Sequence, residues 1–353
     1  CLAAAAGGYG TVVSMANTLP VTDTAEKALA LRRRAEALGL IDLYPALSLT
    51  MGMEGKELSG IAGLPPREAG AGDSAGLYLP LLLSEDGKDV ADRALFSAAF
   101  ADARRLGIPV SCHCDAGGPE AEAAKKSGAP RRVWSAIEEN AATKRAIEIG
   151  RRAGACVHIA HVSTREAAEA VRAAKGSWAG LSCEVTPHHL ALTLEDADAL
   201  GAESHGRVNP PLRTEEDRLA IVAAILDGTV DAIATDHAPH SEADKAGGAP
   251  GFTGLETAFP VCYTSLAARK PPVDLRRLSF LMSASPARIL GLKDRGAIRE
   301  GLRADLTVLD TASSWIVEPA LFKSRGKNSP FGGRELKGRV MLGIHRGRVV
   351  YQI

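Results

Sequence analysis

The sequence has no excess charge of either sign, no long apolar run and few aromatic residues. Its 353 residues carry 42 Lys plus Arg against 42 Asp plus Glu, so no net charge draws the chain to nucleic acid or to an anionic membrane. No apolar run approaches the roughly 20 residues that a membrane-spanning helix needs. The first residues, CLAAAAGGYG, lack the basic flank of a secretory signal. These absences favour a protein that binds neither nucleic acid nor a membrane.

Cysteine is also scarce. Six cysteines, at positions 1, 112, 114, 156, 183 and 262, show no disulfide framework, and reduced thiols in a cytoplasmic protein fit this scatter best. Cys112 and Cys114 flank His113 and could form a thiolate metal site, but no second CxC or CxxC pair accompanies them. We therefore expect both to be small buried residues on a strand.

Apolar, β-branched runs alternate with amphipathic stretches rich in Ala, Arg and Glu. Strict alternation predicts an α/β fold with parallel strands and right-handed crossovers. Thr214, with Asp217 three residues later, is a capping arrangement for the start of the last of these helices. The expected strands are 10–17, 42–49, 77–83, 108–113, 155–161, 180–186 and 230–236, and the expected helices are 24–39, 89–106, 134–153, 164–175 and 214–227.

Seven strand–helix units are visible, whereas a closed (β/α)8 barrel needs eight. The opening CLAAAAGG is similar to the end of a helix stopped by glycine. We therefore expect a TIM-like barrel over residues 1–292 whose first unit is truncated or missing, with its strand upstream of Cys1. Short alternating runs with glycine turns predict a small β-sandwich portion over 293–353.

Polar side chains end five of the predicted strands or follow them closely. In a parallel barrel, chemistry gathers at the C-terminal ends of the strands. Imidazole and carboxylate groups suit Zn²⁺, and an open coordination position lowers the pKa of the water bound there. Because a carboxylate at such a site can also carry a proton to a leaving group, Asp236 is the candidate general acid/base. The five residues are Asn17, Asp86, His113, His161 and Asp236.

Other histidines compete for the metal. His158 lies three residues before His161, which places the two side chains on opposite faces of a regular strand. We expect His161 at the barrel mouth and His158 packed under a helix. His188 and His189 also follow a strand end and remain rival ligands on this argument alone.

Two loops carry further candidates. His237 and His240 follow Asp236 and could hold a substrate carboxylate. Asn209, in GRVNPPLR, is otherwise a turn residue before two prolines. The glycines of residues 247–254 form either a plain connector or a loop whose backbone can approach a ligand.

Eight motifs occur in the order expected of the dihydroorotases of the amidohydrolase superfamily, and the chain resembles their bacterial type I branch over nearly its whole length. The resemblance implies a zinc-dependent (β/α)8 enzyme that interconverts N-carbamoyl-L-aspartate and L-dihydroorotate in pyrimidine biosynthesis, with one or two Zn²⁺ per subunit. It also implies a homodimer and an association with aspartate transcarbamoylase. The motifs are SMANTLP, LSEDGKD, CHCD, HIAHVST, TPHHLALT, GRVNPPLR, IATDHAPH and PGFTGLET.

The resemblance also implies roles for single residues. Asp236 matches the general acid/base of the family, and neither His188 nor His189 matches a metal ligand. Four positions match metal ligands: Asp86, His113, His161 and Asp236. Five positions match substrate contacts: Asn17, Asn209, His240, Gly251 and Gly254.

The chain departs from the family pattern in two places. The family's first strand carries His-x-His-x-Arg, which supplies two zinc ligands and a substrate-binding arginine, but no histidine precedes His113 here. We expect those residues upstream of Cys1. The family's HCED reads HCDAGG, with Cys114 and Asp115, which keeps the metal histidine and changes the loop beyond it.

Two other functions stay open. The first is a related cyclic amidase. A hydantoinase, dihydropyrimidinase or allantoinase usually bridges its metals with a carboxylated lysine, and the run GLYLPLLL at 76–83 has no lysine, which favours a dihydroorotase.

The second alternative function is that of a non-catalytic dihydroorotase-like partner of aspartate transcarbamoylase. Such chains typically lose metal histidines, whereas His113 and His161 are present here. A protein beginning at Cys1 would favour this last reading, because an open barrel of seven strands exposes unpaired edges.

Overall fold

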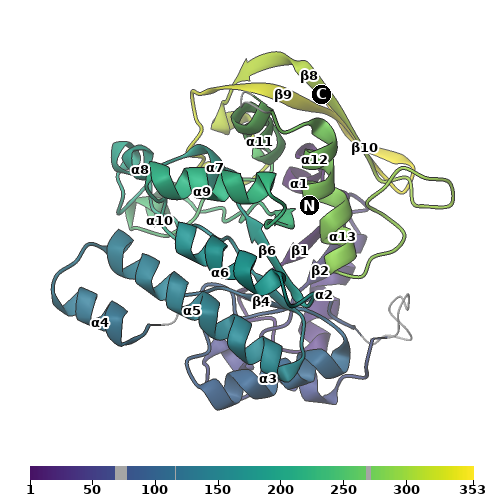
Figure 1. Cartoon of the computed structure of the whole chain (residues 1–353). Helices are drawn as coiled ribbons and strands as arrows, with labels where there is room; N and C mark the ends of the chain where they lie inside the picture. The colour runs from purple at the N-terminus through teal and green to yellow at the C-terminus, as the bar shows by residue number, and fades with distance from the viewer. Residues whose placement is uncertain (68–77, 116, 268–271) are drawn as a thin grey trace.

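The computed structural model describes residues 1–67, 78–115, 117–267 and 272–353. Its strands β1 to β7 run parallel in chain order, with helices on the outside (Figure 1). A single bridge between Leu47 and Leu83 joins the pair β1–β2 to the five-stranded sheet β3–β7. This is the predicted α/β barrel arrangement. The strands are β1 (Thr11–Ser14), β2 (Asp42–Pro45), β3 (Leu83–Ser84), β4 (Val110–Cys112), β5 (Val157–Ile159), β6 (Leu181–Val185) and β7 (Ala232–Ile233).

The strands are shorter than predicted, and the prediction over 77–83 is largely wrong. Residue 77 lies outside the described residues, 78–82 are not in a strand, and pairing begins at Leu83. Pro80 lies in that run and has no N–H to donate to a sheet. The buried Tyr78 instead donates from its hydroxyl to the carbonyl of Pro45, at 2.5 Å.

The five predicted helices are present, and their ends lie within a few residues of those predicted. The predicted helix 89–106 begins only at Arg93, because Asp92 caps it by accepting hydrogen bonds from two backbone N–H groups. Thr214 caps its helix by accepting from the N–H of Asp217, as the sequence predicts. In the described part no helix has the length and apolar character to cross a membrane. The helices of the barrel region are α1 (Leu2–Ala6), α2 (Ala25–Glu36), α3 (Arg93–Leu106), α4 (Pro119–Lys126), α5 (Arg131–Ala153), α6 (Arg165–Lys175), α7 (Pro187–Ala191), α8 (Leu194–Leu200), α9 (Glu215–Leu226), α10 (Glu242–Ala246), α11 (Ala258–Ala267), α12 (Leu275–Ser279) and α13 (Ser285–Ile289).

The C-terminal part forms a three-stranded antiparallel sheet in the order β10–β9–β8. This sheet covers α11 and lies at the top of Figure 1. The division of the chain at residues 292 and 293 stays a prediction. The strands are β8 (Leu306–Ile316), β9 (Glu335–His345) and β10 (Arg348–Gln352).

The packing of α5 on β5 shows which strand face points inward. A Cβ added to Gly150 of α5 would lie 2.1 Å from Cγ2 of Val157, so Val157 faces the helix. His158 therefore faces the barrel interior, since successive residues of a strand alternate. There its ring nitrogens lie 2.8 Å from the Ser182 hydroxyl and 3.0 Å from the Glu184 carboxylate. The expectation that His158 packs under a helix is wrong, because this pair of polar partners on β6 satisfies it inside the barrel.

Candidate metal centre

Three predicted metal positions meet at the carboxyl ends of neighbouring strands. Asp86 follows β3, His113 follows β4 and His161 follows β5. One ligand atom from each lies within 4.8 Å of the others. The two imidazole rings meet edge to face with 2.7 Å between His113 Nδ1 and His161 Nε2, and His113 Nδ1 lies 4.0 Å from Asp86 Oδ1.

The backbone turns sharply to deliver two of the predicted residues. His161 has φ of 33° and Asp236 has φ of 47°, in the left-handed region that side chains other than glycine rarely adopt. Such conformations cost about 1–3 kcal/mol each and cluster at functional sites. His161 also lies beyond the end of β5, so strict strand alternation does not govern its direction.

The charges of Asp86 and His113 act on Asp236, the fourth predicted metal position. Burial, and then the negative charge of Asp86, raise the pKa of the Asp236 carboxyl well above its usual value, while His113 acts to lower it. Its Oδ2 lies 3.7 Å from Nε2 of His188. That His188 nitrogen is buried and has no hydrogen-bond partner among the described residues.

The outer nitrogen of His113 has its own partners. Nε2 of His113 lies 2.9 Å from Asp115 Oδ2, and the Asn209 amide nitrogen lies 3.3 Å from the same oxygen. Burial lowers the pKa of His113, but the hydrogen bond to Asp115 and the nearby carboxylates raise it to about 9 overall. A carboxylate behind a metal-ligating histidine fixes the tautomer and orients the ring. Asp115 therefore leaves Nδ1 of His113 facing Asp86 and His161.

The predicted substrate residues fall into two groups. Asn17 donates from Nδ2 to Asp86 Oδ2 at 2.8 Å, and Asn209 lies 2.9 Å from His113, so both lie at the cluster. The other three lie on the loop after β7, where His240 Nε2 is 2.9 Å from the carbonyl of Pro250. Gly251 has φ of 129°, a conformation that requires glycine. The remaining member of this group is Gly254.

His237 is engaged by its own loop. Its Nδ1 accepts the backbone N–H of Gly254 at 3.1 Å, and residue 237 forms a bridge with Phe252. Burial lowers the pKa of the ring to about 4, which agrees with an unprotonated acceptor nitrogen. His237 therefore anchors the loop that carries Gly254.

Sequence reasoning gave too little weight to three residues. Asp115 is the partner of His113, His188 faces Asp236, and the negative charge of Glu184 raises the pKa of Asp236. One signal was available for Glu184, because a carboxylate at an inward position of an apolar strand needs a partner. The orientations of Asp115, in the loop after β4, and of His188, on the short helix α7, depend on tertiary contacts that no sequence period describes.

The donor set fits a divalent metal ion. Two imidazole nitrogens and a carboxylate oxygen converge, and both histidines are 5% exposed. Nitrogen and oxygen donors of this kind suit Zn²⁺ and related ions. The structure thus supports a metal centre built on Asp86, His113 and His161.

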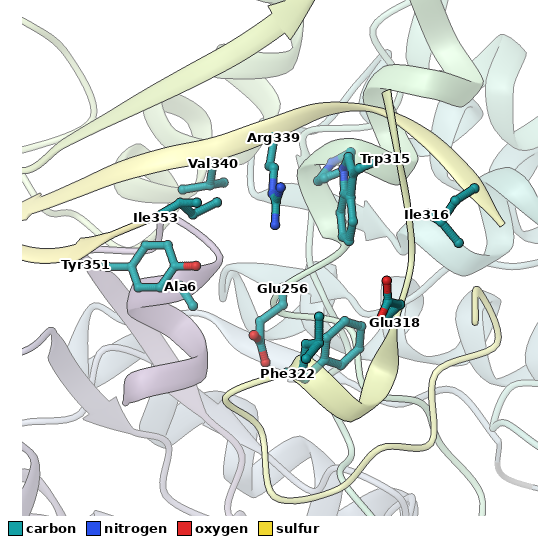
Figure 2. A pocket seen from close by; sticks show the side chains of 12 residues that line it. Ala6, Glu256, Trp315, Ile316, Glu318, Phe322, Arg339, Val340, Tyr351 and Ile353 are labelled. Atoms are coloured by element: carbon teal, nitrogen blue, oxygen red, sulfur yellow. The ribbon is translucent and has the colours of Figure 1, made fainter. Parts of the chain in front are cut away.

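A cavity of about 230 Å³ lies between α11, the C-terminal sheet and the segment 316–322 (Figure 2). Arg339 points into it between Trp315 and Tyr351, with Glu256 on the opposite wall. Because none of the predicted site residues lines this cavity, it is separate from the metal centre.

Comparison with known proteins places the chain in a family. The amidohydrolase family model matches residues 1–350. A dihydroorotase of Anaeromyxobacter dehalogenans is 39% identical over 99% of this chain and 80% of its own length. A dihydroorotase of Clostridium botulinum is 38% identical over the same shares, and one of a Geobacillus species is 36% identical over 99% of this chain and 81% of its own length.

Solved structures agree on the fold. The L-hydantoinase of Arthrobacter aurescens superposes with a TM-score of 0.84 at 24% identity, over 99% of this chain and 79% of its own. The dihydropyrimidinase of Brevibacillus agri gives a TM-score of 0.80 at 19% identity, over the same shares. At these identities the likeness concerns the barrel and its appended sheet. On the family match and the near-complete coverage by its relatives, the chain belongs to the amidohydrolase family and, within it, to the dihydroorotases.

Proposed function

We propose that this protein is a zinc-dependent dihydroorotase, which opens the ring of L-dihydroorotate to N-carbamoyl-L-aspartate and closes it again. The observation that carries the proposal is the meeting of Asp86, His113 and His161 at the ends of successive strands, within the field of Asp236. The relatives named dihydroorotase support the substrate. The family resemblance also supports a homodimer, and an association with aspartate transcarbamoylase.

The proposed metal ligands are the three clustered residues and Asp236. Zn²⁺ bound there, as one ion or two, would supply an activated water and polarise the ring carbonyl. Asp115, through its hydrogen bond to His113, would orient one ligand. Asn17 would do the same for Asp86, whose carboxylate accepts its amide hydrogen.

Asp236 is the proposed general acid/base. Hydrolysis breaks the bond between the ring carbonyl carbon and the ring nitrogen, adds water across it, and needs a proton on the departing nitrogen. Burial and the negative charge of Asp86 raise the pKa of Asp236, which makes its carboxylate a better proton acceptor, so this group can take a proton from water and then release it to that nitrogen. In the ring-closing direction the same proton returns by the reverse route.

The proposed substrate contacts come from two parts of the site. Asn17 and Asn209 lie directly at the cluster and can donate to a carboxylate or to the ring edge. The remaining proposed contacts, His240 and the backbone at Gly251 and Gly254, lie on the loop after β7.

Turnover of a substrate series tests the proposal. We expect hydrolysis of dihydroorotate, loss of that activity after dialysis against a chelator, and recovery on adding Zn²⁺. Hydantoin and allantoin should be much poorer substrates, because Asp86 follows β3 and the run before it has no lysine for carboxylation. Faster turnover of hydantoin or allantoin than of dihydroorotate would assign the protein to another cyclic amidase.

A substitution behind the metal tests the role of Asp115. Asp115→Ala removes the partner of His113 Nε2, and we expect Zn²⁺ affinity to fall about 10- to 100-fold, as for other partners of metal-ligating histidines. Isothermal titration with Zn²⁺ measures this directly. Asp198→Ala, on the exposed surface of α8, is the control and should keep wild-type affinity. If Asp115→Ala bound Zn²⁺ as tightly as Asp198→Ala, Asp115 would have no role in metal binding.

A further inference from the structure

Lys245 of α10 is a lysine whose charged group lies wholly inside the protein. Its side chain is 0% exposed, and Nζ donates to the carbonyls of Arg207 at 2.8 Å, Ala249 at 2.9 Å and Gly251 at 3.0 Å. An ammonium group has three N–H donors, so these acceptors use all of them. The ring of Phe252 lies 5.2 Å from Nζ.

The local charge does not explain why a lysine lies there. No ion pair of Lys245 with a carboxylate is found among the residues that the structure describes, and Arg207 is a like charge. Burial and Arg207 lower its pKa to about 8, so at neutral pH the group is still mainly an ammonium. A cation is retained in a buried position only when it has hydrogen-bond acceptors, and here these are all backbone carbonyls.

Those carbonyls belong to two separate segments of the site. Arg207 lies two residues before Asn209, which contacts His113. Gly251 lies in the loop after β7, where its N–H donates to the carbonyl of Arg207 at 3.0 Å and its carbonyl accepts from Asn328 Nδ2 at 3.1 Å. The Lys245 ammonium therefore ties both segments together at one point.

We propose that Lys245 is a positioning residue that sets substrate affinity by holding the 207–209 segment and the Gly251 loop at a fixed separation. This inference rests on the proposed function, in which Asn209 and Gly251 contact the substrate. A site held in its binding conformation spends less of its interaction energy on ordering loops. The acceptors of Lys245 do not include the clustered metal positions, so its loss acts on KM and leaves kcat nearly unchanged.

Lys245→Met tests this, since methionine has a similar unbranched shape but no donor for the three carbonyls. We expect KM for dihydroorotate to rise about tenfold or more, the scale set by losing a few buried hydrogen bonds. We expect kcat within about threefold of wild type and an unchanged zinc content. Lys175→Met is the matched control, because Lys175 also binds a loop carbonyl, of Thr229, and pairs with Asp231 at the opposite end of β7. That control should keep the wild-type KM.

Hydrogen exchange provides a readout that needs no substrate. In Lys245→Met, the amides of 207–209 and 249–251 should exchange faster, while those of β4 and β5 stay protected. A rise in KM together with faster exchange in both segments supports the proposal. A folded variant with the wild-type KM overturns it, whatever its exchange, and so does an equal loss in kcat accompanied by loss of zinc.

A second variant covers the case in which Lys245→Met does not fold. Arginine keeps the charge in Lys245→Arg, but its planar guanidinium cannot place donors where a compact ammonium does. A higher KM with faster exchange in both segments supports the proposal, and a wild-type KM overturns it. If the wild-type protein turns over no dihydroorotate, the proposed function fails, and the exchange pattern alone decides whether Lys245 holds the two segments together.

Discussion

Asp236→Asn should lower turnover of dihydroorotate by about 10³-fold or more while leaving the fold intact. General acid/base catalysis alone contributes about 10²- to 10⁴-fold, and this carboxylate is also a proposed metal ligand. Asparagine is the better substitution for isolating the chemistry, because it tolerates the left-handed backbone found at this position, where φ is 47°. Alanine at the same place adds backbone strain to the loss of the carboxylate.

Steady-state kinetics with a paired control decides this prediction. Asp231→Asn removes a carboxylate from the other end of the same strand, where Asp231 pairs with Lys175 at 2.7 Å and accepts the N–H of Cys183 at 2.9 Å. That variant should lose some stability and keep its turnover. If Asp236→Asn retained more than a tenth of wild-type kcat with normal zinc content, the general acid/base would have to be another residue.

The order of the barrel and the position of its mouth could be predicted from the sequence because both depend on local patterns. Each apolar run marks a buried strand, and in a parallel sheet the polar residue that ends it lies at one common edge. This reasoning predicted His113 and His161 as neighbours, and in the structure 2.7 Å separates His113 Nδ1 from His161 Nε2. Local caps and periods also predicted the five helices α2, α3, α5, α6 and α9.

Other parts of the site depend on contacts between distant residues and have no local signal. Lys245 binds the backbone carbonyl of Arg207, 38 residues away in the chain. Every residue has such a carbonyl, so nothing in the sequence marks this one as the partner. His158 faces the barrel interior because its partner Glu184 lies on the next strand, and its spacing from His161 does not reveal this, since His161 lies beyond the end of β5. The observed strands are shorter than predicted because apolar residues continue past the point where backbone pairing stops.

A second large effect concerns a buried ion pair behind the cluster. Arg213 donates from Nη2 to Glu139 Oε2 at 3.0 Å, and their side chains are only 4% and 5% exposed. Glu139 also accepts the backbone N–H groups of Ser163 at 2.7 Å and Thr164 at 3.1 Å. Ser163 lies two residues after His161, so this pair fixes the segment that follows a proposed metal ligand.

Arg213→Met should lower the free energy of unfolding by about 3–5 kcal/mol, because it leaves the Glu139 carboxylate buried without its counter-charge. The double variant Arg213→Met with Glu139→Gln should recover part of this loss, since no uncompensated charge remains. Arg172→Met is the control: Arg172 pairs with Asp227 and both side chains are 42% exposed, so its loss should cost no more than about 1 kcal/mol. Denaturant unfolding of the three variants measures these differences.

The pH dependence of that loss separates a buried charge from a simple packing defect. In the wild-type protein burial acts to raise the pKa of Glu139, but the charge of Arg213 and the hydrogen bonds from Ser163 outweigh it and hold the pKa below its usual value. The ionised pair therefore stabilises the fold above the unfolded pKa of about 4.3, and this contribution fades as pH falls through the lower folded value. In Arg213→Met, burial without a partner raises the pKa of Glu139, so protonation relieves the penalty as pH falls through that raised value. The difference in free energy of unfolding between the two proteins should thus become smaller from pH 7 towards pH 5. A difference that stays constant over this range would show that lost packing, and not the buried carboxylate, causes the destabilisation.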